Sequence, residues 1–236
     1  MLDLTCNILG GENRIKFFVK VLKEAKKINI SHLSAGERYI YGEPFLADAY
    51  ITEIIDSLNE ISAELELGVT VLRGNILVGD CFLPSVLKDV ENMTVAGSRY
   101  LLIELPGYSI PAFWPEMCLE YSRMGIVIIC AGAEKHPYIQ ENHGVLEEFA
   151  SRGILFSLGC DSILGKNGEK AKAVAEIMIK KGLVTFVGSF SENEKSKLPH
   201  FYRSYGTIAQ NYGVETAQRL YITNPAKIIY NEASLF

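Results

Sequence analysis

The sequence predicts a single α/β domain in which parallel strands alternate with helices and close into a distorted seven-stranded (β/α) barrel. Seven short, unbroken apolar runs are typical of strands buried on both faces. Segments with apolar residues at helical spacing lie between these runs, and this alternation favours parallel strands. No glycine fingerprint for a nucleotide follows the first run, and the number of runs favours a barrel over an open sheet with a cofactor crevice.

The clearest strand-helix-strand unit lies in the middle of the chain. Residues 100–105 are too few and too uniformly apolar for an amphipathic helix, and residues 126–131 repeat the pattern. Between them, Pro115 suits a first helical turn and Gly125 can end the helix. Glu104 is the exception, because a carboxylate near the end of a buried strand is costly unless it pairs with a cation or holds a metal.

The remaining elements follow from the same two patterns. Residues 45–67 form the clearest amphipathic helix, and the lysines of a helix at 15–27 are interpreted as its solvated face. Residues 34–44 have no period and are predicted to be loop, and 74–80 stay unassigned. Further strands are predicted at 2–6, 28–32, 69–72, 154–158 and 183–188. Further helices are predicted at 84–91, 143–152, 169–181, 199–211 and 214–222.

Composition limits the class of protein. The chain has 236 residues, 48% hydrophobic and 22% charged, so residues 1–236 are predicted to form one domain with a full core. A net charge of −5 with Lys and Arg along the whole chain argues against a nucleic-acid partner or an anionic membrane surface. No apolar run approaches the roughly 20 residues that span a bilayer, and no basic leader opens the chain. We therefore expect a cytoplasmic protein without membrane insertion, with its five cysteines reduced.

Chemistry in a (β/α) barrel is placed on the loops that follow the strands. These loops together form the predicted mouth of the barrel. The residues to inspect there are Thr5 to Asn7, His32, Gly74 to Ile76, Glu104, Gly132 to His136, Gly159 to Gly165 and Ser189 to Ser191.

Several motifs occur in the order and spacing of one known family. The strand RYLLIELP ends near Glu104, DSILGKNG is similar to an S-x-x-G-x-x-G loop, and TNPAKII is similar to a terminal NP motif. Together they resemble the polymerase and histidinol phosphatase (PHP) family, specifically its manganese-dependent bacterial tyrosine phosphatases from capsule operons. The resemblance covers nearly the whole chain. It implies a barrel of PHP type, with Glu104 at the position of a metal-bridging glutamate.

The metal-binding motifs of that family are replaced in this chain. The family motifs DIHCH, AHPER and SDAH fall on DLTCN, AGAEK and GSFS. The resemblance therefore implies that Thr5 and Asn7 stand for two histidines, Gly132 for a third, and Ser189 and Ser191 for an aspartate and a histidine. These five positions and Glu104 are the vestigial metal site.

These replacements predict that no cofactor is bound. Manganese, iron and zinc need imidazole nitrogens or anionic oxygens, whereas a glycine offers no ligand and neutral hydroxyls and amides supply no charge. The family mechanism depends on metals that activate water and neutralise phosphoryl oxygens, so no catalytic residue is assigned. Glu104 is a weak metal candidate, and a pair with a buried cation such as Lys135 is an equal alternative. Ligand spacing does not support a relocated cluster from His32, His136, His143 and His200.

Three functions follow as hypotheses. In the first, the chain is a degenerate PHP-type tyrosine-protein phosphatase homologue that binds or regulates, in capsular or exopolysaccharide synthesis. In the second, it is an active phosphatase with a reduced or altered site for manganese, iron or zinc. In the third, it is another hydrolase that uses Cys6 or the region of Ser189, although no C-x5-R loop follows Cys6 and a buried thiol is favoured. The resemblance implies a tyrosine kinase or a polysaccharide-assembly protein as partner.

Overall fold

The computed structural model describes residues 1–6, 9, 14–40, 42–79, 92–107, 109–192 and 195–232. Asn7, Cys81 and the helix predicted at 84–91 lie outside these residues. No helix of the described ranges combines the length and the hydropathy that a membrane crossing requires.

The described strands form two parallel sheets rather than one. Every neighbouring pair of strands in both sheets is parallel, as the alternation with helices predicts. The three-stranded sheet has the order β1 (Leu2–Asp3), β2 (His32–Ala35) and β4 (Thr70–Arg73). The six-stranded sheet has the order β3 (Arg38–Tyr39), β5 (Ile76–Val78), β6 (Tyr100–Glu104), β7 (Val127–Ala131), β8 (Leu155–Gly159) and β9 (Val184–Gly188).

The prediction of seven strands is wrong, because the described residues contain nine. The two additional strands, β3 and β5, lie in segments that the sequence leaves as loop or unassigned. The backbones approach closely where the two sheets divide, since a Cβ on Gly36 would lie 1.6 Å from the carbonyl oxygen of Gly74. Only glycine permits that approach, and the strands are interrupted there.

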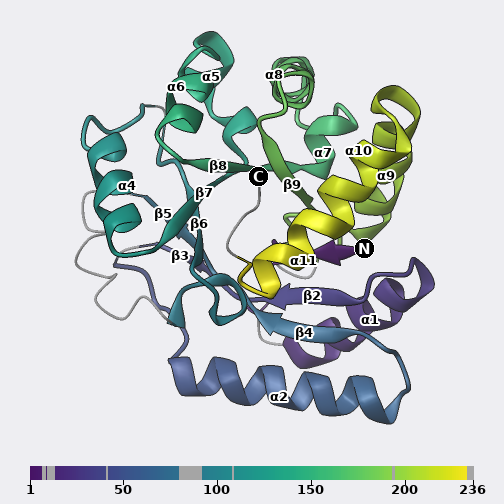
Figure 1. Ribbon diagram of the computed structural model, residues 1–236. Coiled ribbons are helices and arrows are strands. Elements are labelled where there is room, and N and C mark those ends of the chain that lie inside the picture. Colours follow the sequence, from purple (N-terminus) through teal and green to yellow (C-terminus); the bar gives the residue numbers. More distant parts are fainter. Residues whose placement is uncertain are drawn as a thin grey trace.

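Most helices lie on the outer side of the strands, whereas the last helix packs Ile228 against the inner cluster of strand residues (Figure 1). The long ones agree with the predicted segments within a few residues, because each carries a clear apolar face. The helices are α1 (Arg14–Lys27), α2 (Asp48–Glu64), α4 (Trp114–Arg123), α5 (Pro137–Glu141), α6 (Val145–Ser151), α7 (Cys160–Ile163), α8 (Glu169–Lys180), α9 (Leu198–Tyr212), α10 (Val214–Gln218) and α11 (Asn224–Ile229). The shorter helical turns are η2 (Val95–Gly97), η3 (Ala133–Lys135) and η4 (Arg219–Thr223).

Three predicted boundaries are corrected. The strand expected at 2–6 ends at Asp3. The strand expected at 28–32 begins only at His32, because Asn29 has a φ of 57°, in the left-handed region that a strand cannot contain. The helix expected at 214–222 instead passes through the wider turn η4 into α11. Pro225 in the first turn of α11 suits a helix start.

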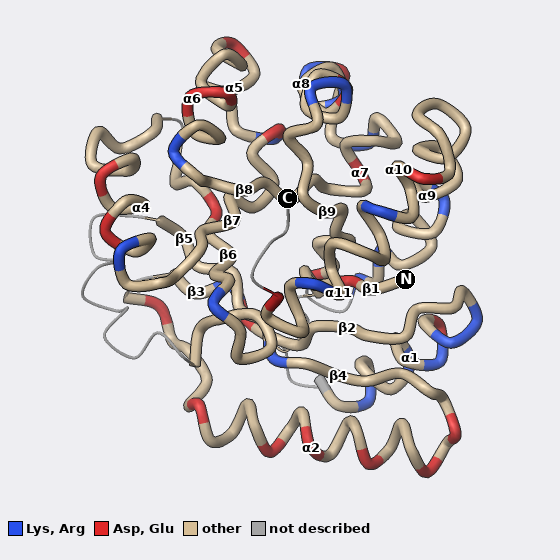
Figure 2. Tube along the Cα trace, in the orientation of Figure 1, with Lys and Arg blue, Asp and Glu red and all other residues tan. Residues whose placement is uncertain are grey.

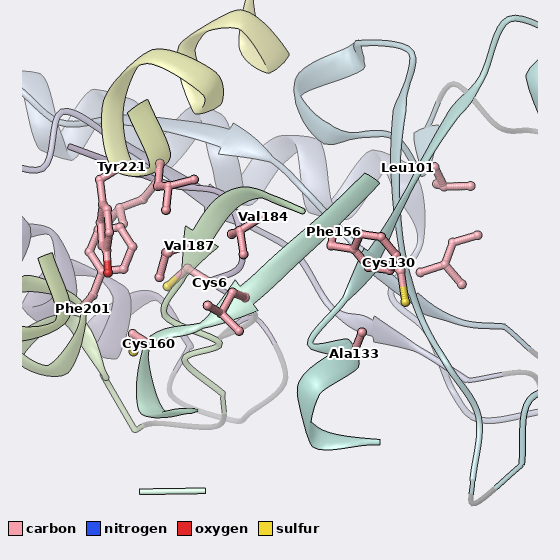
Figure 3. Close-up of a cluster of buried hydrophobic side chains, with 14 of the residues drawn as sticks. Cys6, Leu101, Cys130, Ala133, Phe156, Cys160, Val184, Val187, Phe201 and Tyr221 are labelled. Atoms are coloured by element: carbon pink, nitrogen blue, oxygen red, sulfur yellow. The ribbon is translucent and has the colours of Figure 1, made fainter. Parts of the chain in front are cut away.

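The strands are buried on both faces, as the unbroken apolar runs predict. Leu101, Ile103 and Cys130 belong to the larger core cluster, between the strands and the outer helices. Leu102 and Ile129 point the other way, into a smaller cluster. The close-up in Figure 3 shows part of the larger cluster, including Phe156, Val184, Val187, Phe201 and Tyr221.

Candidate functional site

Asp3 joins the ends of the two sheets at the predicted mouth. Its buried carboxylate oxygen Oδ1 accepts hydrogen bonds from the Thr5 backbone N–H at 3.2 Å, the Thr5 hydroxyl at 3.0 Å and the Ser189 backbone N–H at 3.0 Å. Thr5 Oγ1 in turn accepts from the Phe190 backbone N–H at 3.0 Å. These bonds bring Thr5, after β1, and Ser189, after β9, into one site.

The two serines of the site bond to each other. Ser189 Oγ and Ser191 Oγ lie 2.8 Å apart, and Ser191 Oγ accepts from the Lys197 backbone N–H at 2.9 Å. Both serines are buried. Small hydroxyl side chains therefore satisfy the backbone at the end of β9 and need no ion to do so.

Glu104 pairs with an arginine. Its Oε2 lies 2.8 Å from Nε of Arg38, and the two side chains are 26% and 39% exposed. Arg38 belongs to β3, a strand that the sequence does not predict. The interpretation of Glu104 as an ion-paired carboxylate is thus realised, with Arg38 and not Lys135 as the partner.

Lys135 occupies the space beside Gly132. A Cβ on Gly132 would lie 2.5 Å from Cε and 3.0 Å from Nζ of Lys135. The Lys135 ammonium also lies 4.7 Å from the ring centroid of Phe190, a cation–π contact. Where the family resemblance implies an imidazole, this chain has a glycine covered by a cationic side chain.

Glu104, Arg38, Gly132 and Lys135 border a cavity of about 390 Å³. His136 also lines it, with Nε2 at 3.4 Å from the Pro106 carbonyl oxygen. Burial lowers the pKa of His136, so the neutral imidazole is favoured. The charges that line the cavity are therefore those of Arg38, Lys135 and Glu104. Its lining residues are Arg38, Glu104, Leu105, Gly107, Ala131, Gly132, Ala133, Lys135, His136 and Pro137.

A second polar group lies at the ends of β8 and β9. The predicted mouth includes its Asp161, within Gly159 to Gly165, but the sequence assigned no role to Asp161 or to its partners. Asp161 Oδ1 lies 2.7 Å from Nδ1 of His200, and Asp161 Oδ2 lies 3.5 Å from Nζ of Lys197. His200 is half-buried and bound to this carboxylate. The position of Asp161 directly after a predicted strand was the available signal.

Glu134 lies in the predicted mouth segment Gly132 to His136, without an assigned role, and is fully buried. Its Oε1 accepts from the Gly159 backbone N–H at 3.1 Å and from the Ser162 hydroxyl at 2.7 Å. Burial raises the pKa of this carboxyl. Glu134 therefore ties the turn after β7 to the end of β8, a structural role.

Cys6 is a buried thiol. Burial raises the pKa of Cys6 well above its ordinary value, so the thiol stays protonated at neutral pH. Cys118, Cys130 and Cys160 are buried and free as well. A protonated, solvent-excluded sulfur is a poor nucleophile, which argues against the hydrolase hypothesis that uses Cys6.

A comparison of the sequence with known families matches residues 1–230 to a family described as capsular polysaccharide synthesis, CpsB/CapC. The chain belongs to the CpsB/CapC family. This result confirms the resemblance to tyrosine phosphatases of capsule operons.

Relatives in the CpsB/CapC family are named as tyrosine-protein phosphatases. The putative phosphatase CapC of Staphylococcus aureus is 27% identical, over 80% of this chain and 76% of CapC. YwqE of Bacillus subtilis is 21% identical, over 100% of this chain and 94% of YwqE. Among solved structures, crystal structures of YwqE and of CpsB from Streptococcus pneumoniae are described as metal-dependent tyrosine phosphatases. That match has a TM-score of 0.89 at 21% identity, covers 99% of this chain and 96% of the other, and shows a shared fold.

The described residues do not fit the metal cluster that the CpsB/CapC relatives imply. Across these residues, no group of three or more His, Cys, Asp or Glu side chains could hold a metal ion. Thr5 and Ser189 offer neutral hydroxyls, and Glu104 already pairs with Arg38. The Lys135 ammonium lies beside Gly132, the position at which the family resemblance implies a histidine ligand, and its positive charge would oppose a cation there. Ser191 likewise offers a neutral hydroxyl, and Asn7, the sixth predicted position, lies outside the described residues.

Proposed function

We propose that this chain is a CpsB/CapC family member that has lost metal-dependent phosphatase chemistry and whose mouth binds a ligand or a partner protein. The observation that carries this proposal is the position of Lys135, whose side chain fills the space beside Gly132. Because fold alone does not confer activity, the chemical groups at the site decide whether this chain is a phosphatase.

Electrostatics supports this proposal. A divalent ion about 4 Å from an ammonium is opposed by about 8 kcal/mol at an effective dielectric constant of about 20. The Lys135 ammonium would have to move away or lose its proton before such an ion could bind near Gly132. Glu104 is the one carboxylate at a family ligand position, and Arg38 already balances its charge. The side chains of Arg38 and Lys135 thus supply the positive charge that bound metal ions would otherwise supply.

Retention of Glu104 favours the alternative, an active protein-tyrosine phosphatase with a reduced or altered metal site. In that case Glu104 would exchange Arg38 for manganese, iron or zinc, and further ligands would come from elsewhere in the mouth. The same measurements test both proposals.

We place this function in the cytoplasm, in capsular or exopolysaccharide synthesis, with a tyrosine kinase or a polysaccharide-assembly protein as partner. The name of the family and the names of the relatives support this assignment. We treat residues 1–236 as one functional domain, since the family match spans 1–230.

The purified chain is expected to show no manganese-dependent hydrolysis of p-nitrophenyl phosphate or phosphotyrosine peptides above background. Phosphoryl transfer needs several kcal/mol of charge stabilisation, and the described mouth offers no metal cluster to supply it. Metal content by mass spectrometry and initial rates with added manganese are the measurements. YwqE, assayed in parallel, is the positive control.

Two results together would contradict the proposal. One is stoichiometric manganese, iron or zinc in the purified protein. The other is turnover that rises with added manganese and is abolished by Glu104→Ala but kept by the matched variant Glu116→Ala on α4. Both results together would establish that the chain is an active metal-dependent phosphatase.

A further inference from the structure

A groove lined by lysines lies between α1 and the segment after β9. It encloses a volume of about 620 Å³ and shares no lining residue with the cavity at the mouth. We call it the lysine groove. Its lining residues are Phe17, Lys20, Val21, Lys23, Glu24 and Lys27 of α1, together with Lys195 and Ser196.

Positive charge predominates on α1, where Glu24 is the one acidic residue of the helix. Lys20, Lys23 and Lys27 are spaced by three and four residues, which places them on one face of the helix. Figure 2 shows the blue segments that mark lysine and arginine on α1, beside the red acidic residues of α2. No ion pair joins the two helices in the described part of the chain.

The carboxylate of the groove is already engaged. Glu24 Oε2 accepts a hydrogen bond from the hydroxyl of Ser196, which holds the segment after β9 against α1. Lys195 then approaches the same groove from the opposite side. Glu192, in the same segment, is exposed and does not line the groove. Four lysines and one hydrogen-bonded carboxylate thus line the groove.

Helix stability does not explain this arrangement. Cations stabilise the C-terminal turn of a helix, which accounts for Lys26 and Lys27. Lys20 and Lys23 lie earlier, and like charges at this spacing oppose helix formation. The chain as a whole is acidic, with a net charge of −5, so the cluster is local and not a result of composition. A bound anion would offset the repulsion among the lysines.

The shape of the groove indicates the class of ligand. Val21 is buried and Phe17 is partly buried against the core, so they give the groove an apolar floor below its charged rim. The volume falls within the roughly 300–1,000 Å³ typical of small-molecule sites. Lysine ammonium groups act as point charges that suit phosphate oxygens. We propose that the lysine groove binds a small molecule that carries a di- or triphosphate group.

Isothermal titration with inorganic tripolyphosphate at low salt tests this proposal. The wild-type protein is expected to bind, and the double variant Lys20→Gln, Lys23→Gln is expected to bind about tenfold more weakly or worse. Lys195→Gln, on a separate segment, should also weaken binding. The matched control is Lys170→Gln, Lys180→Gln on α8, which removes the same charge from exposed positions and should leave affinity unchanged. All substituted lysines are exposed, so unfolding midpoints should match that of the wild type.

Four outcomes would overturn the proposal. The first is no binding by the wild type at millimolar tripolyphosphate, and the second is an equal loss of affinity in the α8 control. The third is citrate binding as tightly as tripolyphosphate, which would indicate a general attraction of anions. The fourth is tighter binding of a glutamate-rich peptide, which would assign the groove to a protein partner. Should the double variant unfold, Lys195→Gln alone decides between these results.

Discussion

Replacing Asp3 with alanine is expected to lower the free energy of unfolding by about 3 kcal/mol. The buried Oδ1 of Asp3 accepts from the backbone N–H groups of Thr5 and Ser189, and alanine would leave both donors buried and unpaired. Each unpaired buried donor costs about 1–3 kcal/mol, and removal of a buried carboxylate offsets part of the loss. Denaturant unfolding followed by circular dichroism measures the difference.

Asp3→Asn is the matched control for this prediction. The amide keeps an oxygen at the Oδ1 position, and Oδ2, which it would replace, has no partner among the described residues. We therefore expect Asp3→Asn to unfold within about 1 kcal/mol of the wild type. Equal losses in the alanine and asparagine variants would show that the charge, and not the hydrogen bonds, holds the two sheets together.

The wild type and Asp3→Asn should differ in the pH dependence of their stability. Burial raises the pKa of Asp3 above its ordinary value of 3.8, so the folded state holds this proton more tightly than the unfolded state. The stability contributed by Asp3 is then complete below about pH 4 and declines as the pH rises through the folded-state pKa. The Asp3→Asn variant lacks this decline. The free energies of unfolding of the wild type and of Asp3→Asn, measured between pH 4 and pH 7, should therefore diverge. Asp3→Asn should be the more stable of the two at the higher pH.

The sequence predicts the main strands because burial on both faces leaves a continuous apolar run. β6 and β7 are examples, and the predicted ranges differ from the observed ones by one residue at an end. β3 and β5 were missed because they have two and three residues. β1 is as short, but it lies in the longer apolar run predicted at 2–6. β3 and β5 lie in no such run, and only their pairing with neighbouring strands identifies them.

The candidate site was predictable in part for a similar reason. Parallel strands place their C-terminal ends together, and this rule brings Thr5 and Ser189 into one predicted mouth, where they do meet through Asp3. The roles of Arg38 and Lys135 were not predictable in this way. Both are long, flexible side chains, and which carboxylate or ring they reach depends on packing between elements far apart in the sequence.

Restoring the metal site is expected to need a change at Lys135 as well as new ligands. The five substitutions that follow the family resemblance are Thr5→His, Asn7→His, Gly132→His, Ser189→Asp and Ser191→His. An imidazole at position 132 would meet the Lys135 side chain, because even a Cβ there lies 2.5 Å from Lys135 Cε. Position 132 also has a φ of 64°, which costs a non-glycine residue about 1–2 kcal/mol. We therefore expect little gain in manganese affinity from the five substitutions alone.

Adding Lys135→Ala to the five substitutions is expected to raise manganese affinity by about a hundredfold or more. The sixth change removes both the steric obstacle and a positive charge whose repulsion of a divalent ion amounts to several kcal/mol. Titration of manganese followed by electron paramagnetic resonance measures the free ion directly. Thr5 and Ser191 are buried, so circular dichroism of each variant is the control for folding.

Lys135→Ala in the otherwise unchanged chain is the control, and it should bind no manganese because the ligands are still missing. If the five-substitution variant bound manganese as tightly as the six-substitution variant, Lys135 would not be the obstacle. If neither bound it, the Arg38–Glu104 pair would be the remaining barrier, since Glu104 would have to give up its 2.8 Å contact with Arg38 before it could bind a metal. Arg38→Ala in the six-substitution variant would then free that carboxylate, so the order in which affinity returns identifies which of the two cations keeps metal out of the mouth.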